Sequence, residues 1–501
     1  MAYTILDCYT DEPAGLGVPP YLGTHPRYLA GYLKEKYNEE IDYITIDDLR
    51  AYKAAETIAV GRGGWVGTRT KNIKPSQKTG IKTYNLTKNF SRIKDVLNET
   101  KTLFVILGVQ TPGKYLSAVP GTLNEVIALL KELNLRCKKI LTGPAVFGTQ
   151  LYGGRFFEKA DLSFFDSVTD FDFSYDDVKD FAIKGSSIIK QIPDLRIVEI
   201  ETGHGCRKGK CSFCIEPIKY SLGFREKEDI IAEVSEFYKS GIEYFRIGKQ
   251  SDFYAYPKAV ELLEEIRKNF PGIKVLHIDN VDPVSVVNDK DNRITKAIVK
   301  YCTAGNVAAL GIESFDPVVI TENCLNSTPE MSYKAIKLLN KFGSEREDNG
   351  MPSYLPGINL VFGLKGESKN TSNENLLWLK RILNESLLVR RINIRQVAIF
   401  EGTPLFKECG DKFLRKNRRY YWKWRNEIRQ NIDFPMLKKL VPAGTILKDV
   451  RMEIYDGNTA FGRQIGTYPL IVGVKQRLEL GKFYNIKVTS HMLRSVVGVA
   501  V

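Results

Sequence analysis

Apolar segments alternate with amphipathic segments along the first part of the chain. Residues 4–9 and 102–109 are short apolar runs typical of buried strands, whereas residues 27–36 and 124–135 space their apolar positions as an amphipathic helix does. Strands that alternate with helices are typical of a parallel sheet covered on both faces. We therefore expect a doubly wound, Rossmann-like α/β domain over residues 1–185.

Two glycine-rich segments interrupt this domain. Residues 142–154 (TGPAVFGTQLYGG) follow an apolar strand, where glycines permit either a sharp turn or a close approach of the backbone to a ligand. Residues 60–88 are rich in glycine and in basic side chains. We expect a long loop there, and loops of this length in a compact domain are often functional.

A second alternating series extends from residue 196 to residue 406. Its apolar runs are separated by segments with helical spacing, and they lie at 196–202, 243–248, 274–279, 307–312, 357–364 and 392–400. Six strands with intervening helices predict a parallel (β/α)6 barrel, closed or partial, with its chemistry at the carboxyl ends of the strands. We assign this core to residues 186–430.

The pattern then changes to short strands separated by Gly, Asp and Asn turns, which predicts a small antiparallel β-barrel over residues 431–501. Just before it, residues 412–429 interleave basic and aromatic side chains. Arginines bind phosphates and aromatic rings stack on unpaired bases, so this segment is a candidate RNA-binding surface. The alternative is an amphipathic helix that packs some of these rings into the barrel. The candidate RNA contacts are Arg415, Arg418, Arg419, Tyr420, Trp422 and Arg425.

The composition is that of an ordinary globular protein, with 43% hydrophobic and 26% charged residues among 501, so extensive disorder is excluded. No apolar stretch approaches the roughly 18 residues of a membrane-spanning helix, and the start of the chain does not resemble a signal peptide. We expect a cytoplasmic protein that does not enter a membrane. The net charge of +14 favours an anionic partner such as RNA, although it also suits a solubilising surface.

Three of the eight cysteines are bunched directly after the first strand of the second series. Cys206, Cys211 and Cys214 have the spacing C-x4-C-x2-C, and soft thiolates bind zinc, Cu(I) or iron–sulfur clusters. A structural zinc ion needs four ligands, and His204 is the candidate fourth. The more natural interpretation is a [4Fe–4S] cluster with three irons held by cysteine and one left open.

With these cysteines at the head of a barrel-like series, residues 200–410 resemble the radical S-adenosylmethionine (radical SAM) superfamily. The usual spacing of that family is C-x3-C-x2-C, so this chain has one extra residue between Cys206 and Cys211. The resemblance implies a [4Fe–4S] cluster whose open iron binds S-adenosylmethionine, reductive cleavage to a 5′-deoxyadenosyl radical, and a reductant protein of the ferredoxin or flavodoxin type. Radical abstraction requires no acid or base at a recognisable spacing, so no such residue is singled out.

Segments after the other strands match the family in barrel order, among them GKQ at 248–250, LGIESFDP at 310–317 and FGLKGES at 362–368. Any one of these glycines is also ordinary turn chemistry after a parallel strand. The resemblance implies S-adenosylmethionine contacts from Phe213, Gly248, Gln250, Asp279, Asn280, Gly311, Glu313, Ser314, Gly363 and Gly402.

The flanking parts resemble two branches of the family. Residues 1–185 are similar to the cobalamin-binding type of Rossmann domain, although no histidine lies in an Asp-x-His-x-x-Gly motif. Methylthiotransferases carry three N-terminal cysteines, and only Cys8 and Cys137 occur here. Residues 431–501 resemble the TRAM type of RNA-binding barrel. The sequence motifs GHGC…CSFCIEP and FGRQIGTYP are similar to those of an archaeal-type group of radical SAM proteins.

These observations lead to three hypotheses. The first is a radical SAM enzyme that modifies RNA, for example tRNA, by methylation or sulfur insertion. The second is a cobalamin-dependent methylase that acts on a protein or a small molecule. The third, of another class, is a zinc-stabilised RNA-binding protein without catalysis, which the metal content distinguishes from the other two.

Overall fold

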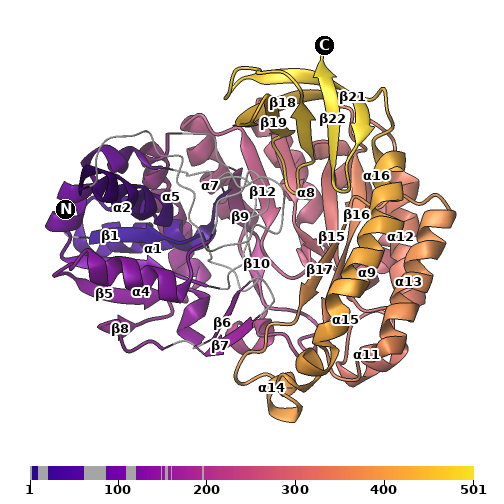
Figure 1. Ribbon diagram of the computed structural model, residues 1–501, viewed down its shortest axis with the longest axis horizontal. Coiled ribbons are helices and arrows are strands. Elements are labelled where there is room, and N and C mark those ends of the chain that lie inside the picture. Colours follow the sequence, from indigo (N-terminus) through magenta and orange to yellow (C-terminus); the bar gives the residue numbers. More distant parts are fainter. Residues whose placement is uncertain are drawn as a thin grey trace. The chain divides into compact units, whose positions relative to one another are not determined.

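A computed structural model describes residues 3–9, 21–60, 86–108, 120–147, 149–152, 156–159, 161–193 and 197–501. The chain divides into two compact units, Met1–Arg196 and Ile197–Val501 (Figure 1). The predicted fold class is confirmed, because a doubly wound sheet, a partial β/α barrel and a small closed β-barrel are all present. Most of the predicted loop at 60–88 and three of the glycines at 142–154 lie outside the described residues.

The first unit is built on a parallel five-stranded sheet in the order β3-β1-β4-β5-β8. In the order of the chain this is 2-1-3-4-5, the doubly wound order whose switch point lies between the first and third strands. The strands are β1 (Tyr3–Asp7), β3 (Asp42–Thr45), β4 (Thr102–Ile106), β5 (Lys138–Thr142) and β8 (Ser167–Val168). The helices are α1 (Thr24–Tyr37), α2 (Ile46–Val60), α3 (Ile93–Glu99), α4 (Leu123–Glu132) and α5 (Tyr175–Gly185).

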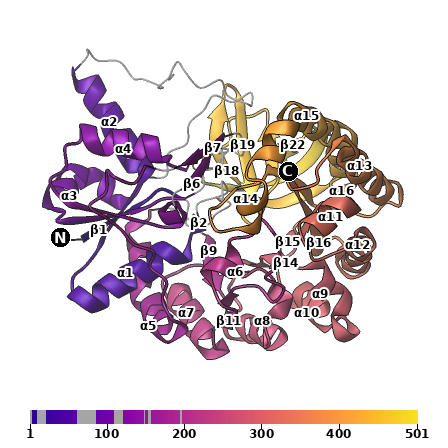
Figure 2. The same cartoon turned by 90° about the horizontal axis from the view of Figure 1, so that it is seen from below.

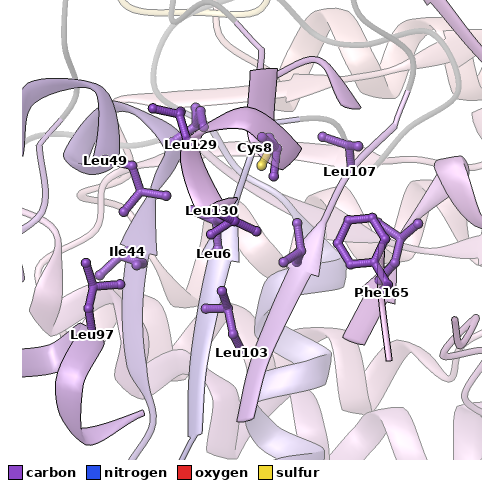
Figure 3. Close-up of a cluster of buried hydrophobic side chains, with 14 of the residues drawn as sticks. Leu6, Cys8, Ile44, Leu49, Leu97, Leu103, Leu107, Leu129, Leu130 and Phe165 are labelled. Carbon is purple, nitrogen blue, oxygen red and sulfur yellow. The ribbon is translucent and has the colours of Figure 1, made fainter. Parts of the chain in front are cut away.

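The core of this unit lies between the sheet and its helices. Leu6, Ile44 and Leu103 come from three neighbouring strands and pack in one cluster with Leu129 and Leu130 of α4 (Figure 3). Burying each leucine contributes about 1.5–3 kcal/mol. The apolar runs and helical spacings of the sequence therefore predicted the elements and the faces that meet.

The second unit begins with six parallel strands arranged as a partial (β/α)6 barrel. They pair in two sheets, β9-β12-β13 and β14-β15-β16-β17, because the third strand is broken at Asp279 into β13 and β14. Helices α10, α12 and α13 lie outside the strands (Figure 2). The strands are β9 (Ile197–Glu201), β12 (Tyr244–Gly248), β13 (Val275–Ile278), β14 (Asn280–Val281), β15 (Asn306–Glu313), β16 (Tyr354–Phe362) and β17 (Arg391–Gln396). The main helices are α7 (Lys227–Lys239), α8 (Ala259–Asn269), α10 (Arg293–Tyr301), α12 (Pro329–Gly343) and α13 (Lys369–Asn384).

The free edge of β17 is covered by helix α15 (Lys412–Ile428) and the turn that follows it. The Tyr421 hydroxyl donates a hydrogen bond to the Ile394 carbonyl (3.3 Å), and Arg429 Nη1 donates one to the Ile392 carbonyl (2.7 Å). Edge strands need such a cover because their backbone groups otherwise invite pairing with another chain.

The chain ends in a closed barrel with the strand order β18-β19-β20-β22-β21. Helix α16 (Phe434–Leu440) precedes it, where short strands were expected, and β20 and β22 pair in parallel whereas the other neighbours are antiparallel. The strands are β18 (Ile446–Asp456), β19 (Thr459–Gln464), β20 (Ile471–Val474), β21 (Phe483–His491) and β22 (Ser495–Ala500). Among the described residues, no helix is both long enough and apolar enough to cross a bilayer.

Candidate functional site

The cysteine loop lies at the carboxyl end of the first barrel strand. Gly203–His204 (β10) pairs antiparallel with Gly223–Phe224 (β11), so the intervening segment is closed at its base. Cys206, Cys211 and Cys214 lie within this segment, and all three thiols are free and half-buried. This is the end of a β/α barrel at which chemistry takes place.

Short hydrogen bonds fix the cysteine loop to two other barrel segments. The hydroxyl of Ser212 donates to Asn323 Oδ1 (2.7 Å), and the backbone N–H of Ser212 donates to the Asn323 carbonyl (3.0 Å). The backbone N–H of Leu405 donates to the Ser212 carbonyl (2.8 Å). The loop is therefore held by the segments that follow β15 and β17. Phe213 is half-buried and packs beside Cys211 against the apolar cluster that contains Leu405.

The three thiols lie close enough to influence one another. Burial raises the pKa of Cys211 to about 12, and the neighbouring Glu313 and Cys206 add to the increase. Burial likewise raises the pKa of Cys214 to about 12, with a contribution from the other two cysteines. Because metal ligands must be thiolates, metal binding at this loop releases protons.

The donor set consists of three thiols, one fewer than the four ligands of a structural zinc site. Among the described residues, no group of three or more His, Cys, Asp and Glu side chains is placed to hold one metal ion. Three ligands to three different irons need not converge on one point, whereas a zinc site requires that convergence. His204 stacks on Tyr220 with ring centroids 4.8 Å apart, and its Nδ1 is 3.9 Å from Glu201. The arrangement thus gives no support to a zinc site completed by His204.

Comparison with known proteins agrees with this geometry. Residues 200–371 match the model of the radical SAM superfamily. The chain is 39% identical to an uncharacterised protein of Methanocaldococcus jannaschii, over 99% of this chain and 92% of the relative. It is 37% identical to an uncharacterised protein of Archaeoglobus fulgidus, over 100% of this chain and 90% of the relative.

The chain belongs to the radical SAM superfamily. Among solved structures it is similar to the radical SAM methyltransferase TsrM from Kitasatospora setae, with 12% identity, a TM-score of 0.47, and 81% of this chain and 74% of that chain covered. It is also similar to the cobalamin-dependent radical enzyme OxsB, with 14% identity, a TM-score of 0.47, and 84% of this chain and 56% of that chain covered.

As a member of this superfamily, the protein is an enzyme that uses a [4Fe–4S] cluster and S-adenosylmethionine. Cys206, Cys211 and Cys214 are the residues that would hold the cluster. A cluster bound there supplies the electron for reductive cleavage of S-adenosylmethionine. The protein itself positions the loop through Asn323 and Leu405 and buries the thiols, and such burial tunes redox potential.

Gln250 lies beside a cavity next to the cysteine loop. The cavity has a volume of about 300 Å³ and is lined by Cys206, Gln250, Asp252 and Asp282, among others. Gln250 is 2% exposed, and its Nε2 donates to the Asp252 carbonyl (3.0 Å). Within the described part of the chain its Oε1 has no hydrogen-bond partner. A buried acceptor without a partner suits a ligand donor, which fits its predicted role as a cofactor contact.

The structure places Asp279 in an ion-pair group inside the barrel. Arg246 pairs with Asp279 and lies 3.3 Å from Glu199 on the adjacent strand, and all three side chains are buried. Asn280 Nδ2 donates to the Gln250 carbonyl (3.3 Å). Gly248 has φ of +143°, and a Cβ there would lie 2.9 Å from that of Asp279. These residues hold the end of β12 against the third strand, and their contact with S-adenosylmethionine stays a prediction.

The end of β15 carries three of the predicted cofactor contacts, Gly311, Glu313 and Ser314. The side chains of the last two differ in their interactions. Glu313 has a left-handed backbone with φ of +64°, and burial raises its pKa to about 7 while Arg395 opposes the increase. Ser314 is 1% exposed, and its hydroxyl accepts a hydrogen bond from the Asp316 N–H (3.1 Å). Glu313 therefore has an ionisable group near the cysteine loop, whereas Ser314 is engaged in a backbone turn.

The last two predicted glycines lie in turns. Gly363 has φ of +95°, and its N–H donates to Glu367 Oε2 (2.7 Å). Burial raises the pKa of Glu367 to about 8. Gly402 has φ of +88° and precedes helix α14 (Pro404–Glu408). Both glycines serve backbone conformations that other residues rarely adopt, and their contact with S-adenosylmethionine stays a prediction.

Sequence reasoning missed two residues that contribute to the site. Asn323 anchors the cysteine loop but belongs to no motif, so no signal in the chain indicates it. The positive charge of Arg395 opposes the increase that burial causes in the pKa of Glu313. The segment RINIRQ places Arg391, Asn393 and Arg395 at alternate positions of a strand, and this period of two could have indicated a polar lumen face.

The basic segment 412–429 is largely the helix α15, with two different faces. Tyr421 and Trp424 are buried at 6% and 4% exposure, and both rings pack against Phe362. The alternative that some of the rings pack into the barrel is thus confirmed for these two. Trp422 is 42% exposed. Of the other candidate RNA contacts, Arg415, Arg418 and Arg419 are exposed, and Tyr420 and Arg425 are half-buried.

Proposed function

We propose that this radical SAM enzyme modifies RNA. The observation that carries the proposal is the exposed face of α15. The exposed residues of this helix include no acidic side chain; they are Lys412, Arg415, Lys416, Arg418, Arg419, Trp422, Lys423 and Asn426. Cationic side chains neutralise phosphates, and an exposed indole offers a stacking surface for an unpaired base.

Two further features support RNA as the substrate. The net charge of the chain is +14, and the C-terminal part is a closed five-stranded barrel like those of small RNA-binding modules. Methyl transfer and sulfur insertion are the two modifications that the family resemblance suggests. Both require the modified base to reach the carboxyl end of the barrel.

A binding measurement tests this proposal. The variant Arg415→Gln/Arg418→Gln/Arg419→Gln removes three positive charges from the exposed face of α15. We expect it to bind single-stranded RNA about tenfold more weakly or worse, with a salt dependence shallower by about 0.7 per lost phosphate contact. The matched control Lys290→Gln/Arg293→Gln/Lys296→Gln removes the same charge from exposed positions around α10. Equal affinity of the two variants contradicts the proposal.

A turnover measurement tests it independently. The reconstituted enzyme with S-adenosylmethionine and dithionite is incubated with total tRNA, and digested nucleosides are analysed by mass spectrometry. We expect a nucleoside of increased mass that depends on S-adenosylmethionine. Cleavage of S-adenosylmethionine that RNA neither stimulates nor couples to a product contradicts RNA as the substrate.

A second candidate is cobalamin-dependent methylation, and it has one observation in its favour. The first unit has the strand order 2-1-3-4-5, and ligands of such sheets bind beside the carboxyl ends of the strands at the switch point. Here that point lies between β1 and β4, near Cys8 and Leu107. Retention of hydroxocobalamin by the enzyme through gel filtration supports this candidate, and complete loss contradicts it.

A further inference from the structure

The cysteine loop, residues 205–222, carries an excess of positive charge. It has four basic residues and one acidic residue, which are Arg207, Lys208, Lys210, Lys219 and Glu216. Arg207 and Lys210 are exposed, whereas Glu216 is half-buried and its Oε1 accepts a hydrogen bond from the Gly205 N–H (2.9 Å). The exposed charges of this loop are therefore all positive.

Two large aliphatic side chains of the same loop are also exposed. Ile218 is 50% exposed and Leu222 is 45% exposed. A single exposed aliphatic residue is ordinary on a protein surface, whereas several that lie together beside charged residues are typical of a contact site for another molecule. The relative positions of these residues therefore decide what they indicate.

Close backbone contacts bring the exposed residues together. A Cβ at Gly209 would lie 3.3 Å from Pro217 Cβ and 3.5 Å from the Cys206 carbonyl oxygen. The turn that carries Lys210 thus packs against helix α6 (Glu216–Lys219), which carries Ile218. A Cβ at Gly205 would lie 2.7 Å from the Cα of Leu222, so Leu222 is adjacent to the residue that precedes Cys206. The cations and the aliphatic side chains therefore form one surface around the thiols.

The composition of this surface favours a protein partner over RNA. The exposed residues of the loop include no aromatic ring on which a base could stack, whereas α15 offers Trp422. Aliphatic side chains such as Ile218 and Leu222 gain stability when they leave water against another apolar surface. Exposed cations beside them select a partner that carries acidic charge.

The chemistry of the superfamily requires a partner at this place. Each reductive cleavage of S-adenosylmethionine consumes one electron, which has to come from another molecule. Electron transfer between proteins slows steeply with distance, so the donor has to approach the thiols closely. Complexes that serve electron transfer bury little area and are guided by complementary charge. A small surface with cations and two aliphatic residues suits such a brief encounter.

We infer that the exposed side of the cysteine loop, with Arg207, Lys210, Ile218 and Leu222, is the docking surface for an acidic one-electron carrier protein. One electron passes from the reduced carrier, which is thereby oxidised, through the cluster to the sulfonium of S-adenosylmethionine. The carbon–sulfur bond then breaks into methionine and the 5′-deoxyadenosyl radical. The inference is independent of RNA as the substrate, because modification of any substrate needs the same electron.

Binding is measured first, with the full chain and its reconstituted cluster. The surface selects acidic charge rather than a particular redox group, so a flavodoxin and an acidic ferredoxin are the probes, titrated by calorimetry at low ionic strength. We expect the variant Lys210→Glu/Ile218→Gln to bind both probes about tenfold more weakly or worse, since it reverses one charge and removes one apolar contact. The matched control Leu377→Gln/Lys380→Glu makes the same kinds of change at exposed positions of α13.

Turnover provides a second measurement. Formation of 5′-deoxyadenosine is followed with reduced flavodoxin below its saturating concentration and, separately, with dithionite. Dithionite is a small molecule that needs no docking surface. We expect the flavodoxin-driven rate of the loop variant to fall about tenfold and its dithionite-driven rate to stay unchanged. Both rates should stay unchanged in the α13 control. Thermal unfolding and iron content verify that each variant is intact.

Several outcomes overturn the inference. Carrier binding that is equal in the loop variant and the α13 control does so, as does the absence of binding of either probe to the unmodified enzyme. Single-stranded RNA binding that is lost in the loop variant while carrier binding is unchanged assigns the surface to RNA instead. If the double variant loses iron, Lys210→Gln is compared with Lys380→Gln, and equal carrier binding of these two again overturns the inference. Loss of RNA binding in the α15 variant concerns the proposed function alone.

Discussion

The imidazole Nδ1 of His277, on the third barrel strand, accepts a hydrogen bond of 3.0 Å from the backbone N–H of Thr467, on the loop between β19 and β20. The loop approaches so closely that a Cβ at Gly466 would lie 2.9 Å from His277 Cε1. The FGRQIGTYP segment therefore inserts at the amino-terminal mouth of the partial barrel. Tyr468 follows Thr467 in the same loop, and the guanidinium of Arg391 lies over its ring. The C-terminal barrel is thus a structural part of the catalytic core.

This contact predicts a pH-dependent loss of stability. Burial lowers the pKa of His277 to about 4, so the folded protein resists protonation at this residue, whereas the unfolded chain takes up the proton near pH 6.5. The contribution of His277 is complete above about pH 6.5 and decreases as the pH falls towards 4, by up to about 3 kcal/mol. Urea unfolding at several pH values measures it. We expect His277→Gln to show a weaker decrease over this range, and equal pH dependence in both proteins contradicts the assignment.

Asn323 predicts how firmly the cysteine loop is held. Its buried side chain binds the Ser212 hydroxyl, the backbone of Lys365 and the Val319 carbonyl. Asn323→Ala leaves buried donors and acceptors without partners, and each such group lowers the free energy of unfolding by about 1–3 kcal/mol. We expect a lower urea midpoint and faster loss of iron during anaerobic dialysis of the reconstituted enzyme. Asn370→Ala, on the exposed start of α13, is the control, and iron retention equal to the control would rule out the anchor.

Two neighbouring tryptophans of α15 are predicted to have opposite roles. Trp424 is buried, and its ring centroid lies 5.4 Å from that of Phe362. Trp424→Ala should therefore lower the free energy of unfolding by about 3–5 kcal/mol. Trp422 is exposed, so Trp422→Ala should change the free energy of unfolding by no more than about 0.5 kcal/mol. The same variant should weaken RNA binding by about 1–3 kcal/mol. Unfolding and RNA titration of both variants measure the contrast. If both variants lose the same stability, the helix does not have the two faces described.

The elements of the fold could be predicted from the sequence wherever a local hydrophobic pattern determines them. Buried parallel strands are continuous apolar runs, so the barrel strands and the Rossmann-like sheet could be found from their pattern. The break of the third strand at Asp279 could not be found, because this residue pairs with Arg246 of the neighbouring strand, a contact between distant parts of the sequence that an apolar pattern does not reveal. The parallel pairing of β20 with β22 depends likewise on closure of the whole barrel.

Some residues of the candidate site could likewise be predicted from the sequence, and others could not. The three cysteines could be predicted as cluster ligands because their spacing is local and their chemistry distinctive, and this assignment stays a prediction. The division of α15 into buried and exposed rings required the position of β17, whose free edge the helix covers.

The central claim is that Cys206, Cys211 and Cys214 together hold a [4Fe–4S] cluster that binds and cleaves S-adenosylmethionine. Its most direct test is anaerobic reconstitution with iron and sulfide, followed by S-adenosylmethionine and dithionite and by measurement of bound iron and 5′-deoxyadenosine. We expect iron and sulfide in equal amounts and formation of 5′-deoxyadenosine, both lost when any of the three cysteines is changed to alanine and kept in Cys302→Ala. A chain that binds no iron, or cysteine variants that keep their iron and still form 5′-deoxyadenosine, contradicts the claim.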